Sequence, residues 1–499
     1  NTYPPLPNGS LVFLIGMAME ELKKIGLLTS IRVEEERLDF MALNGFRIYN
    51  DMSHLELSTP SYNTPLEAVI YDKVCELFAF YAVQNLRNYF NEVNIYKNNV
   101  SKTSTVEKGR EIFSAVSYST HASTILDRGV CNPQVWRQVE EALIPYMVTR
   151  IILIGGGDIV PCLRDGGFQH YRKELRGENL KYVISPRATF IRSISSNDTV
   201  DYRGLLNERD EPHANEQKYW RLHDINWEGL RSLYQIYLRD CLETLVLMAY
   251  EKGFLRNAPK IANPVESINS ISMDTEEFDW KVSLENGRKV DIIAEILEGF
   301  YLAGIEEMME ESDPNPVDRM GFNLIKATLH VLSERRLEYF IDGLDWVTKK
   351  TLIDEYAPNN MEDAIGICNQ YSLIDQSVLE YLGEKIDPSE RQTTFSPEGA
   401  LEFARESIPL VNWGELGQLV RRALKNGPEG TREYIRCLVA REFPLYVESI
   451  GWGKIRFPNT MILLEEPFKF NKEQCGDQLE RSIDTFDSFI RAIHEIEKT

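Results

Sequence analysis

One run of alternating residues carries enough polar side chains to do chemistry. In the run Asn44–Asp51, apolar residues alternate with polar ones. A period of two predicts a strand with two different faces, so Arg47, Tyr49 and Asp51 share one face. If that face opens into a cleft, Asp51 could act as a nucleophile or general base beside a cation and a phenol. An exposed sheet face with an Arg–Asp pair is the simpler alternative.

The next segment repeats this alternation. His54 and Glu56 fall on one face, opposite Leu55 and Leu57. A carboxylate beside an imidazole, with Asp51 nearby, could help to hold Mg²⁺, which prefers oxygen ligands. A solvated edge strand would explain the same pattern without a metal.

A dense polar run, Asn207–Ala214, surrounds Pro212, which is hard to place in a helix. Arg209 could clamp phosphate oxygens through two hydrogen bonds, and Glu211 could take a metal. A charged turn before the helix predicted at Trp227–Glu251 is the alternative. The unusual density of ionisable groups favours a functional role.

Two shorter runs, Tyr96–Asn99 and Ser117–His121, are further candidates. Asn98 and its neighbour could bind substrate or nucleotide at a strand end, although a turn would explain them equally well. The glycines 155–157 match neither common phosphate-binding spacing, and no lysine follows them. They are predicted to form a turn.

Periodicity predicts the elements that must position these groups. Helices are predicted at Leu11–Leu28, Thr64–Phe90, Pro133–Val148, Trp227–Glu251, Val290–Met309, Gly321–Tyr339, Leu344–Tyr356 and Thr431–Phe443. Further strands are predicted at Val93–Asn99, Lys181–Ser195, Lys454–Phe457 and Met461–Leu464. The polar segment Lys102–Gly109 is predicted to be a loop.

This order of elements predicts an α+β fold in two parts. Residues 1–425 would form a large domain, with a helical second half and an insertion near residues 377–425. Residues 426–499 would form a small C-terminal domain.

Composition narrows the functional classes. The net charge of −22 disfavours nucleic acid and anionic lipid as partners. The seven cysteines are scattered without a Cys-x-x-Cys pair, which indicates free thiols in a reducing cytoplasm rather than a Cys-based zinc site. No apolar run is long enough to span a membrane.

Taken together and in order, these runs resemble the Pup ligase and Pup deamidase/depupylase family, part of the glutamine-synthetase-like carboxylate–amine ligase superfamily. The run Asn207–His213 is the most specific block. Thr64–Lys73 is similar to the depupylase branch, whereas Ser195 and Ser196 are closer to the ligase branch. The resemblance covers most of the chain outside Ser377–Lys425, and we favour the depupylase branch.

The resemblance implies a curved antiparallel sheet that holds ATP and Mg²⁺ on its concave face, with helices behind it. It implies that Asp51 is the catalytic aspartate. The cofactor-binding residues implied are Arg47, Tyr49, Asn98, Arg209 and His213, and the metal-binding residues are Glu56, Glu211 and His121.

The implied activity is removal of the small protein modifier Pup, or a Pup-like modifier, from substrate lysines, and deamidation of its C-terminal glutamine. The alternatives are the Pup–protein ligase reaction and a non-catalytic homologue that binds the modifier. Pup-tagged proteins in the cytoplasm would be the partners. The groove for the modifier is predicted to be locally basic, through Arg172, Lys173, Arg176, Lys218 and Arg221.

Two features depart from the family pattern. The family opens with a strand carrying Glu-x-Glu, which the start of this chain lacks, and it follows its Thr/Cys-His with Glu-Asn, where this chain has Ala122 and Ser123 after His121. Fewer carboxylates predict weaker magnesium binding. We therefore expect a further strand before Asn1 and an omitted loop near Arg37–Leu43; an inactive homologue is the alternative.

Overall fold

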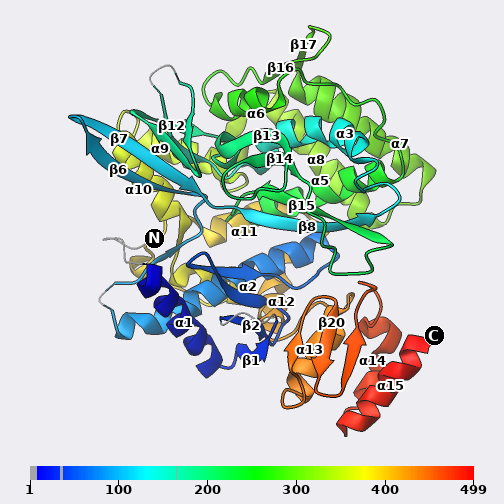
Figure 1. Ribbon diagram of the computed structural model, residues 1–499. Coiled ribbons are helices and arrows are strands. Elements are labelled where there is room, and N and C mark those ends of the chain that lie inside the picture. The colour runs from blue at the N-terminus through cyan, green and yellow to red at the C-terminus, as the bar shows by residue number, and fades with distance from the viewer. Residues whose placement is uncertain (1–7, 34–37, 91, 164–165, 499) are drawn as a thin grey trace.

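A sheet of seven strands joins the two ends of the chain (Figure 1). The computed structural model describes residues 8–33, 38–90, 92–163 and 166–498. The strand order is β21-β20-β19-β1-β2-β3-β4, and all neighbours are antiparallel except β1 and β19. The strands are β1 (Leu28–Arg32), β2 (Asp39–Ala42), β3 (Arg47–Asp51), β4 (His54–Ser58), β19 (Ser449–Ile450), β20 (Lys454–Phe457) and β21 (Thr460–Leu463).

The β3–β4 hairpin confirms the predicted alternation. Ile48 is fully buried, whereas Asp51 is exposed. The turn uses Met52 and Ser53 at φ 44° and 70°, a conformation that suits the tight twist of a two-residue hairpin. The buried face lies on the helical core, so the polar face is free to form a site.

The remaining strands form smaller sheets. β8 (Thr120–Asp127) pairs with β15 (Tyr219–Trp227), and β13 (Ile191–Ser196) runs parallel to β14 (Arg203–Asn207). A four-stranded sheet has the order β10-β11-β7-β6. Other strands are β5 (Ile95–Tyr96), β6 (Val100–Glu107), β7 (Arg110–Ser117), β9 (Asp158–Cys162), β10 (Gln169–Tyr171), β11 (Glu174–Gly177), β12 (Asn179–Val183), β16 (Lys281–Ser283), β17 (Lys289–Asp291) and β18 (Leu373–Ile374).

The loop predicted at Lys102–Gly109 is wrong. This segment and the next form the β6–β7 hairpin, and most of β6 beyond its first residues is exposed. Because much of the ribbon lies in solvent, no apolar face was needed, and the sequence carries no alternation of apolar residues to reveal the strand.

Helices pack behind and around the strands. They are α1 (Asn8–Lys24), α2 (Pro65–Gln84), α3 (Trp136–Thr149), α4 (Ile151–Ile154), α5 (Leu233–Glu251), α6 (Pro264–Met273), α7 (Ala303–Glu311), α8 (Pro316–Ser333), α9 (Asp345–Tyr356), α10 (Met361–Ser372), α11 (Pro397–Ser407), α12 (Leu416–Ala423), α13 (Glu433–Glu442), α14 (Lys472–Glu480) and α15 (Phe486–Lys498). A π-helical segment, Ile292–Leu302, precedes α7. The predicted helix start at Trp227 is wrong, because Trp227 ends β15 and Ser232 caps α5.

The C-terminal segment has its own core but shares the main sheet. Side chains of α13, α14 and α15 pack on β19–β21 and also on Ile31, Val33 and Met41. The region 377–425 packs on the main core through α11 and α12. Over the ranges that the structure describes, no helix is long and apolar enough to cross a membrane.

The strand expected before Asn1 lies outside the described residues, and so does Arg37, the first residue of the expected loop interval, together with residues 1–7 and 34–36. Residues 39–42, within the second expected interval, form β2.

Candidate active site

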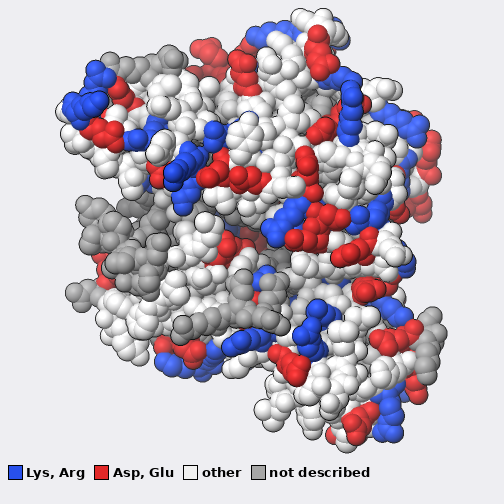
Figure 2. Space-filling view, viewed as in Figure 1, with Lys and Arg blue, Asp and Glu red and all other residues white. Residues whose placement is uncertain are grey.

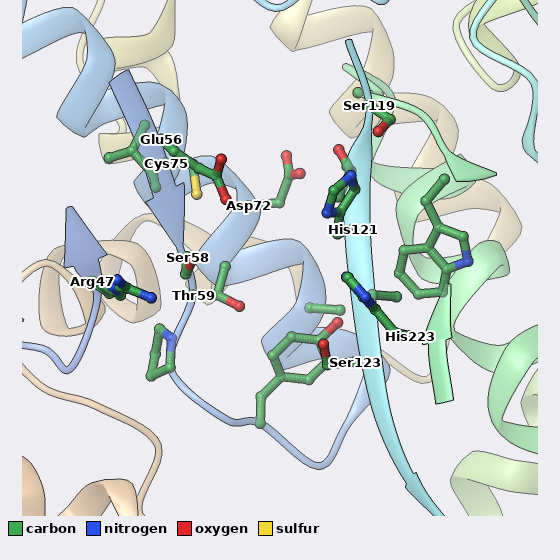
Figure 3. Close-up of a pocket in the computed structure, with 18 of the residues that line it drawn as sticks. Arg47, Glu56, Ser58, Thr59, Asp72, Cys75, Ser119, His121, Ser123 and His223 are labelled. Atoms are coloured by element: carbon green, nitrogen blue, oxygen red, sulfur yellow. The ribbon is translucent and has the colours of Figure 1, made fainter. Parts of the chain in front are cut away.

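A cleft of about 1780 Å³ lies between the β3–β4 hairpin and the β8–β15 pair. Figure 3 shows Glu56 and Ser58 on one side, His121, Ser123 and His223 on the other, and Asp72 between them. The two sides differ in charge, and we call them the acidic wall (β3, β4 and the adjoining face of α2) and the basic wall (β8, β15 and the segments packed against them).

The acidic wall centres on the β3–β4 hairpin. Tyr49 donates a hydrogen bond to Glu56, its direct partner across the two strands. Burial, and then the nearby charge of Asp51, raise the pKa of Glu56. Arg47 stacks on the Tyr49 ring at 4.1 Å and pairs with Asp39 through bonds of 3.0 and 3.1 Å. Asp51 thus stands at the exposed strand end, beside a second carboxylate.

Behind this hairpin, an ion network fixes the floor of the cleft. The Lys97 ammonium lies 2.6 Å from Asp72 and 3.1 Å from Glu76, and Lys73 also pairs with both acids. Arg231 completes the network on Glu76. Burial opposes ionisation of Glu76, but Arg231 and the two lysines outweigh it and lower its pKa. The network holds α2 and β5 together beside the site.

The basic wall contains two facing imidazoles. His121 and His223 lie 5.2 Å apart, edge to face. Desolvation inside the cleft and then Arg187 lower the pKa of His121 to about 3, and burial and then Arg221 lower that of His223 to about 4. Both rings are therefore neutral near pH 7, and the positive charge of this wall comes from arginines.

The run between β14 and β15 adds a second group of charges. Glu211 accepts hydrogen bonds from Arg209 at 3.0 Å and from Arg221 at 3.3 Å. His213 has φ 50°, and its carbonyl accepts a bond of 2.6 Å from Arg432, which ties this run to the C-terminal segment. Partial burial alone would raise the pKa of Glu211. The hydrogen bond from Arg209 outweighs burial and holds this pKa below its usual value.

The structure brings all the predicted site residues to one cleft. Its lining includes Arg47, Tyr49, Asp51, Glu56, Asn98, His121, Arg209, Glu211 and His213. Asn98 uses its amide to donate 2.7 Å to the Val100 carbonyl, so it also shapes the strand end. The individual roles stay predictions.

The metal-binding set is divided between the walls. No group of three or more His, Cys, Asp or Glu residues that could hold a metal occurs in the described part of the chain. Asp51 and Glu56 fit a magnesium ion held by one or two carboxylates together with phosphate oxygens. Glu211 and His121 lie instead among arginines, surroundings that favour an anion. Their part in metal binding stays a prediction.

The predicted basic groove lies only partly in the cleft, and the predicted glycine turn lies outside it. Of the basic groove residues, Lys173 and Arg221 line the cleft, whereas Arg176 and Lys218 pair with Glu107 and Glu466. The glycines 155–157 form the predicted turn outside the cleft lining: the Gly156 amide donates 2.6 Å to Glu228, and Lys349 donates to the carbonyls of Gly156 and Gly157. These backbone groups are engaged within the fold, as expected of a structural turn.

Sequence reasoning missed Arg187 and Arg203, and it gave Lys97 no role within the candidate run Tyr96–Asn99. All three line the cleft. Arg187 stands in the otherwise apolar or neutral run Ser185–Ile191. A lone arginine in such a run is a signal that could have identified it, because arginine is rarely buried unless its charge is paired.

Comparison with known proteins decides the family. The chain matches the family described as Pup-ligase protein over residues 18–456. The protein belongs to the Pup-ligase family. The Pup deamidase/depupylase of Mycolicibacterium smegmatis is 26% identical over 464 residues, which cover 91% of this chain and 82% of that protein. The depupylase of Acidothermus cellulolyticus is 28% identical over 454 residues, which cover 88% of this chain and 80% of that protein.

Ligases are also among its relatives in the Pup-ligase family. A Pup–protein ligase of a Nocardioides species is 28% identical over 321 residues, 63% of this chain and 64% of the ligase. The Pup ligase PafA in complex with ADP shares the fold with a TM-score of 0.65 at 18% identity, over 97% of this chain and 93% of PafA. PafA in its complex with Pup gives a TM-score of 0.67 at 19% identity, over 97% of this chain and 88% of that one. The predicted α+β fold is confirmed.

Proposed function

We propose that this protein is an ATP-dependent isopeptidase that removes Pup or a Pup-like modifier from substrate lysines and deamidates the modifier's C-terminal glutamine. The observation that carries this choice is the extent of the alignments. The two depupylases compared above align over 88–91% of the chain, whereas the Nocardioides ligase aligns over 63%.

The acidic wall supports acid–base or nucleophilic chemistry. Asp51 is exposed at the end of β3 and is within reach of a substrate carbonyl or of an attacking water placed in the cleft. Glu56, fixed by Tyr49, would share a magnesium ion with it. When bound, Mg-ATP supplies phosphate oxygens and positive charge that polarise the reacting group.

The basic wall supports the recognition of anions. Arg209 and Arg221 project into the cleft from the run before β15 and from β15 itself. Guanidinium groups bind phosphate oxygens through paired hydrogen bonds. These two side chains would therefore hold nucleotide phosphates from the wall of the cleft that faces β3 and β4.

The same cleft could also run the ligase reaction, and the ligase relatives keep that alternative open. The deciding experiment incubates the protein with a Pup-conjugated substrate and Mg-ATP and follows the masses of intact proteins. We expect free Pup and unmodified substrate to appear. Conjugates forming from free Pup and substrate would instead identify a ligase.

A non-catalytic homologue is separated by a second measurement. Mg-ATP that binds only the folded state raises the melting temperature, by an amount that corresponds to about 2.7 kcal/mol at a hundredfold excess over Kd. Binding of nucleotide and Pup without either reaction would show that the protein only binds the modifier.

A further inference from the structure

Two buried arginines at one end of the cleft have no acidic partner. Arg187 is 1% exposed and Arg203 is 5% exposed, and both line the cleft. Among the described residues, neither forms an ion pair. A buried charge without a counter-charge is strongly unfavourable, so an arrangement with two of them calls for a compensating group.

The contacts of these arginines leave room for an anion. Arg187 donates to the Ile225 carbonyl at 3.0 and 2.8 Å and to the Ser117 hydroxyl at 3.2 Å. Arg203 donates from Nε to the Thr199 carbonyl at 2.8 Å, and its other two nitrogens have no hydrogen-bond partner in the part of the chain that the structure describes. Burial lowers the pKa of Arg203 to about 10, and burial followed by Arg203 lowers that of Arg187.

The acids nearest to Arg187 are already engaged. Asp224 forms an ion pair with the buried Arg150. Glu228 accepts backbone hydrogen bonds from Gly156 and from Arg187 itself.

The acids nearest to Arg203 do not form an ion pair with it either. Asp198 accepts backbone bonds at 2.7 and 2.9 Å from Val200 and Asp201. Asp201 is exposed, and it raises the pKa of Arg203 only as the weaker of two nearby charges. Neither acid comes within ion-pair distance of Arg203, so the counter-charge must come from outside the described chain.

This pair is separate from the Arg209–Arg221 group. Arg187 bonds to Ile225, four residues along β15 from Arg221, which corresponds to roughly 13 Å along a strand. The cleft therefore offers two cationic subsites, one at each end of the His121–His223 pair.

The Arg187 subsite lies at the Asp51 end of the cleft. Asp51 is paired with His54 across the hairpin, and the His54 ring lies 5.0 Å from that of Tyr118. Tyr118 follows Ser117, which accepts a bond from Arg187. A C-terminal residue whose side-chain amide reacts at Asp51 carries a free α-carboxylate only a few bonds away.

We propose that Arg187 and Arg203 bind the α-carboxylate of the modifier's C-terminal residue, leaving Arg209 and Arg221 to the phosphates of the nucleotide. This inference rests on the proposed function. Paired guanidinium groups suit a planar carboxylate, and the subsite would make the enzyme specific for a modifier that ends at the reacting residue.

The test compares two synthetic peptides from the modifier's C-terminus, one with a free α-carboxylate and one with an α-amide, both ending in glutamine. We expect the parent protein to bind and deamidate the acid at least about tenfold better than the amide. Arg203→Met should remove this preference and leave the affinity for ADP within about twofold. Arg187→Lys keeps a charge but not the paired geometry, and should reduce the preference in part.

Arg192→Met is the matched control, because Arg192 lies on β13 outside this cleft and contacts Tyr202 instead. It should keep the full preference for the acid. Circular dichroism and melting curves identify any variant that fails to fold; Arg203→Gln, with a shorter uncharged side chain, is then measured in place of Arg203→Met.

Two results would overturn the inference. Equal use of acid and amide by the parent protein would exclude a carboxylate subsite while leaving the proposed function standing. A loss of ADP affinity of tenfold or more in Arg203→Met, with the preference for the acid retained, would assign the subsite to a nucleotide phosphate. Failure of the parent to bind either peptide would contradict the proposed function itself.

Discussion

Tyr49 of β3 donates a hydrogen bond to Glu56 of β4, the residue directly opposite it in the hairpin. The bond orients one carboxylate along the cleft, while Asp51 stays exposed two residues further along the same strand. The two acids therefore have different surroundings: Glu56 is partly buried and engaged, and Asp51 is open to substrate. This difference favours Asp51 as the reactive group of the proposed reaction.

Asp51→Asn should abolish turnover and leave the fold intact. The side chain is exposed and contributes little to packing, so the melting temperature should stay within about 2 °C of the parent value. Turnover is followed by mass spectrometry of Pup-conjugated substrate. Asp313→Asn, at a fully exposed site far along the chain, is the control. Full activity in Asp51→Asn would remove this residue from the mechanism.

Gly157→Ala should destabilise the protein by about 2–4 kcal/mol. The glycine has φ 60°, and an added Cβ would lie 2.7 Å from the Cα of Trp346 and against the Tyr182 hydroxyl. Gly109→Ala is a matched control, with φ 78° but open space around the new methyl group, and should cost about 1 kcal/mol. Urea unfolding of both variants measures the difference. Equal costs would mean that backbone conformation, and not crowding, limits the position of Gly157.

Asp240 should make stability depend on pH. Burial raises the pKa of this carboxyl from 3.8 to about 6, and Arg239 and the 3.2 Å bond from Tyr62 offset burial only in part. The folded protein thus holds the proton more tightly than the unfolded chain does. The contribution of Asp240 to the free energy of unfolding is most favourable below about pH 4 and is lost as the pH rises through 6.

Asp240→Asn cannot titrate, so the comparison isolates this group. Relative to the parent, the variant should gain stability as pH rises from 4 to 6, by up to about 1.4 kcal/mol per pH unit. Urea unfolding at several pH values across this window, with both proteins in the same buffers, measures the change. A difference that stays constant with pH would show that Asp240 titrates normally.

Association with an acidic modifier should slow as salt increases. The protein carries a net charge of −22, and Figure 2 shows acidic and basic side chains interspersed over one face of the molecule. Only local cations such as Lys173 and Arg221 can therefore attract an acidic partner to the cleft. Lys173→Ala should lower the association rate several-fold at low salt and less at high salt. Stopped-flow fluorescence with a labelled modifier measures this, and Lys181→Ala, away from the cleft lining, is the control. A rate independent of salt in the parent would argue against an acidic partner.

The alternating hairpin was predictable because its two faces meet different surroundings. Burial of Ile48 against the helices and exposure of Asp51 to the cleft impose a period of two that the sequence must satisfy. The β6–β7 ribbon was not predictable in this way, because Lys102–Gly109 has little apolar surface to bury. A strand that is held mainly by backbone hydrogen bonds to its partner needs no regular alternation of apolar and polar side chains, so its sequence predicts it only weakly.

The acidic wall was predictable from spacing along two adjacent strands, whereas the basic wall was predictable only in part. Arg209 and Arg221 stood in a dense polar run and an expected basic groove, but Arg187 comes from a short 3-10 helix and Arg203 from β14. No local spacing links such residues, since only the tertiary fold brings them to one cleft. The division of Glu56 from Glu211 and His121 between the two walls is likewise invisible in the order of the sequence.

The parallel pairing of β1 with β19 has a consequence for synthesis. Arg32 is in register with Ser449, so one strand of the pair is made roughly 400 residues before the other. At about 5–20 residues per second, translation leaves the outer edge of β1 unpaired for about 20–80 s. A nascent chain with an open sheet edge can pair with the wrong strand. Ribosome-bound chains that end before β19 should therefore depend on chaperones far more than chains that extend past β21.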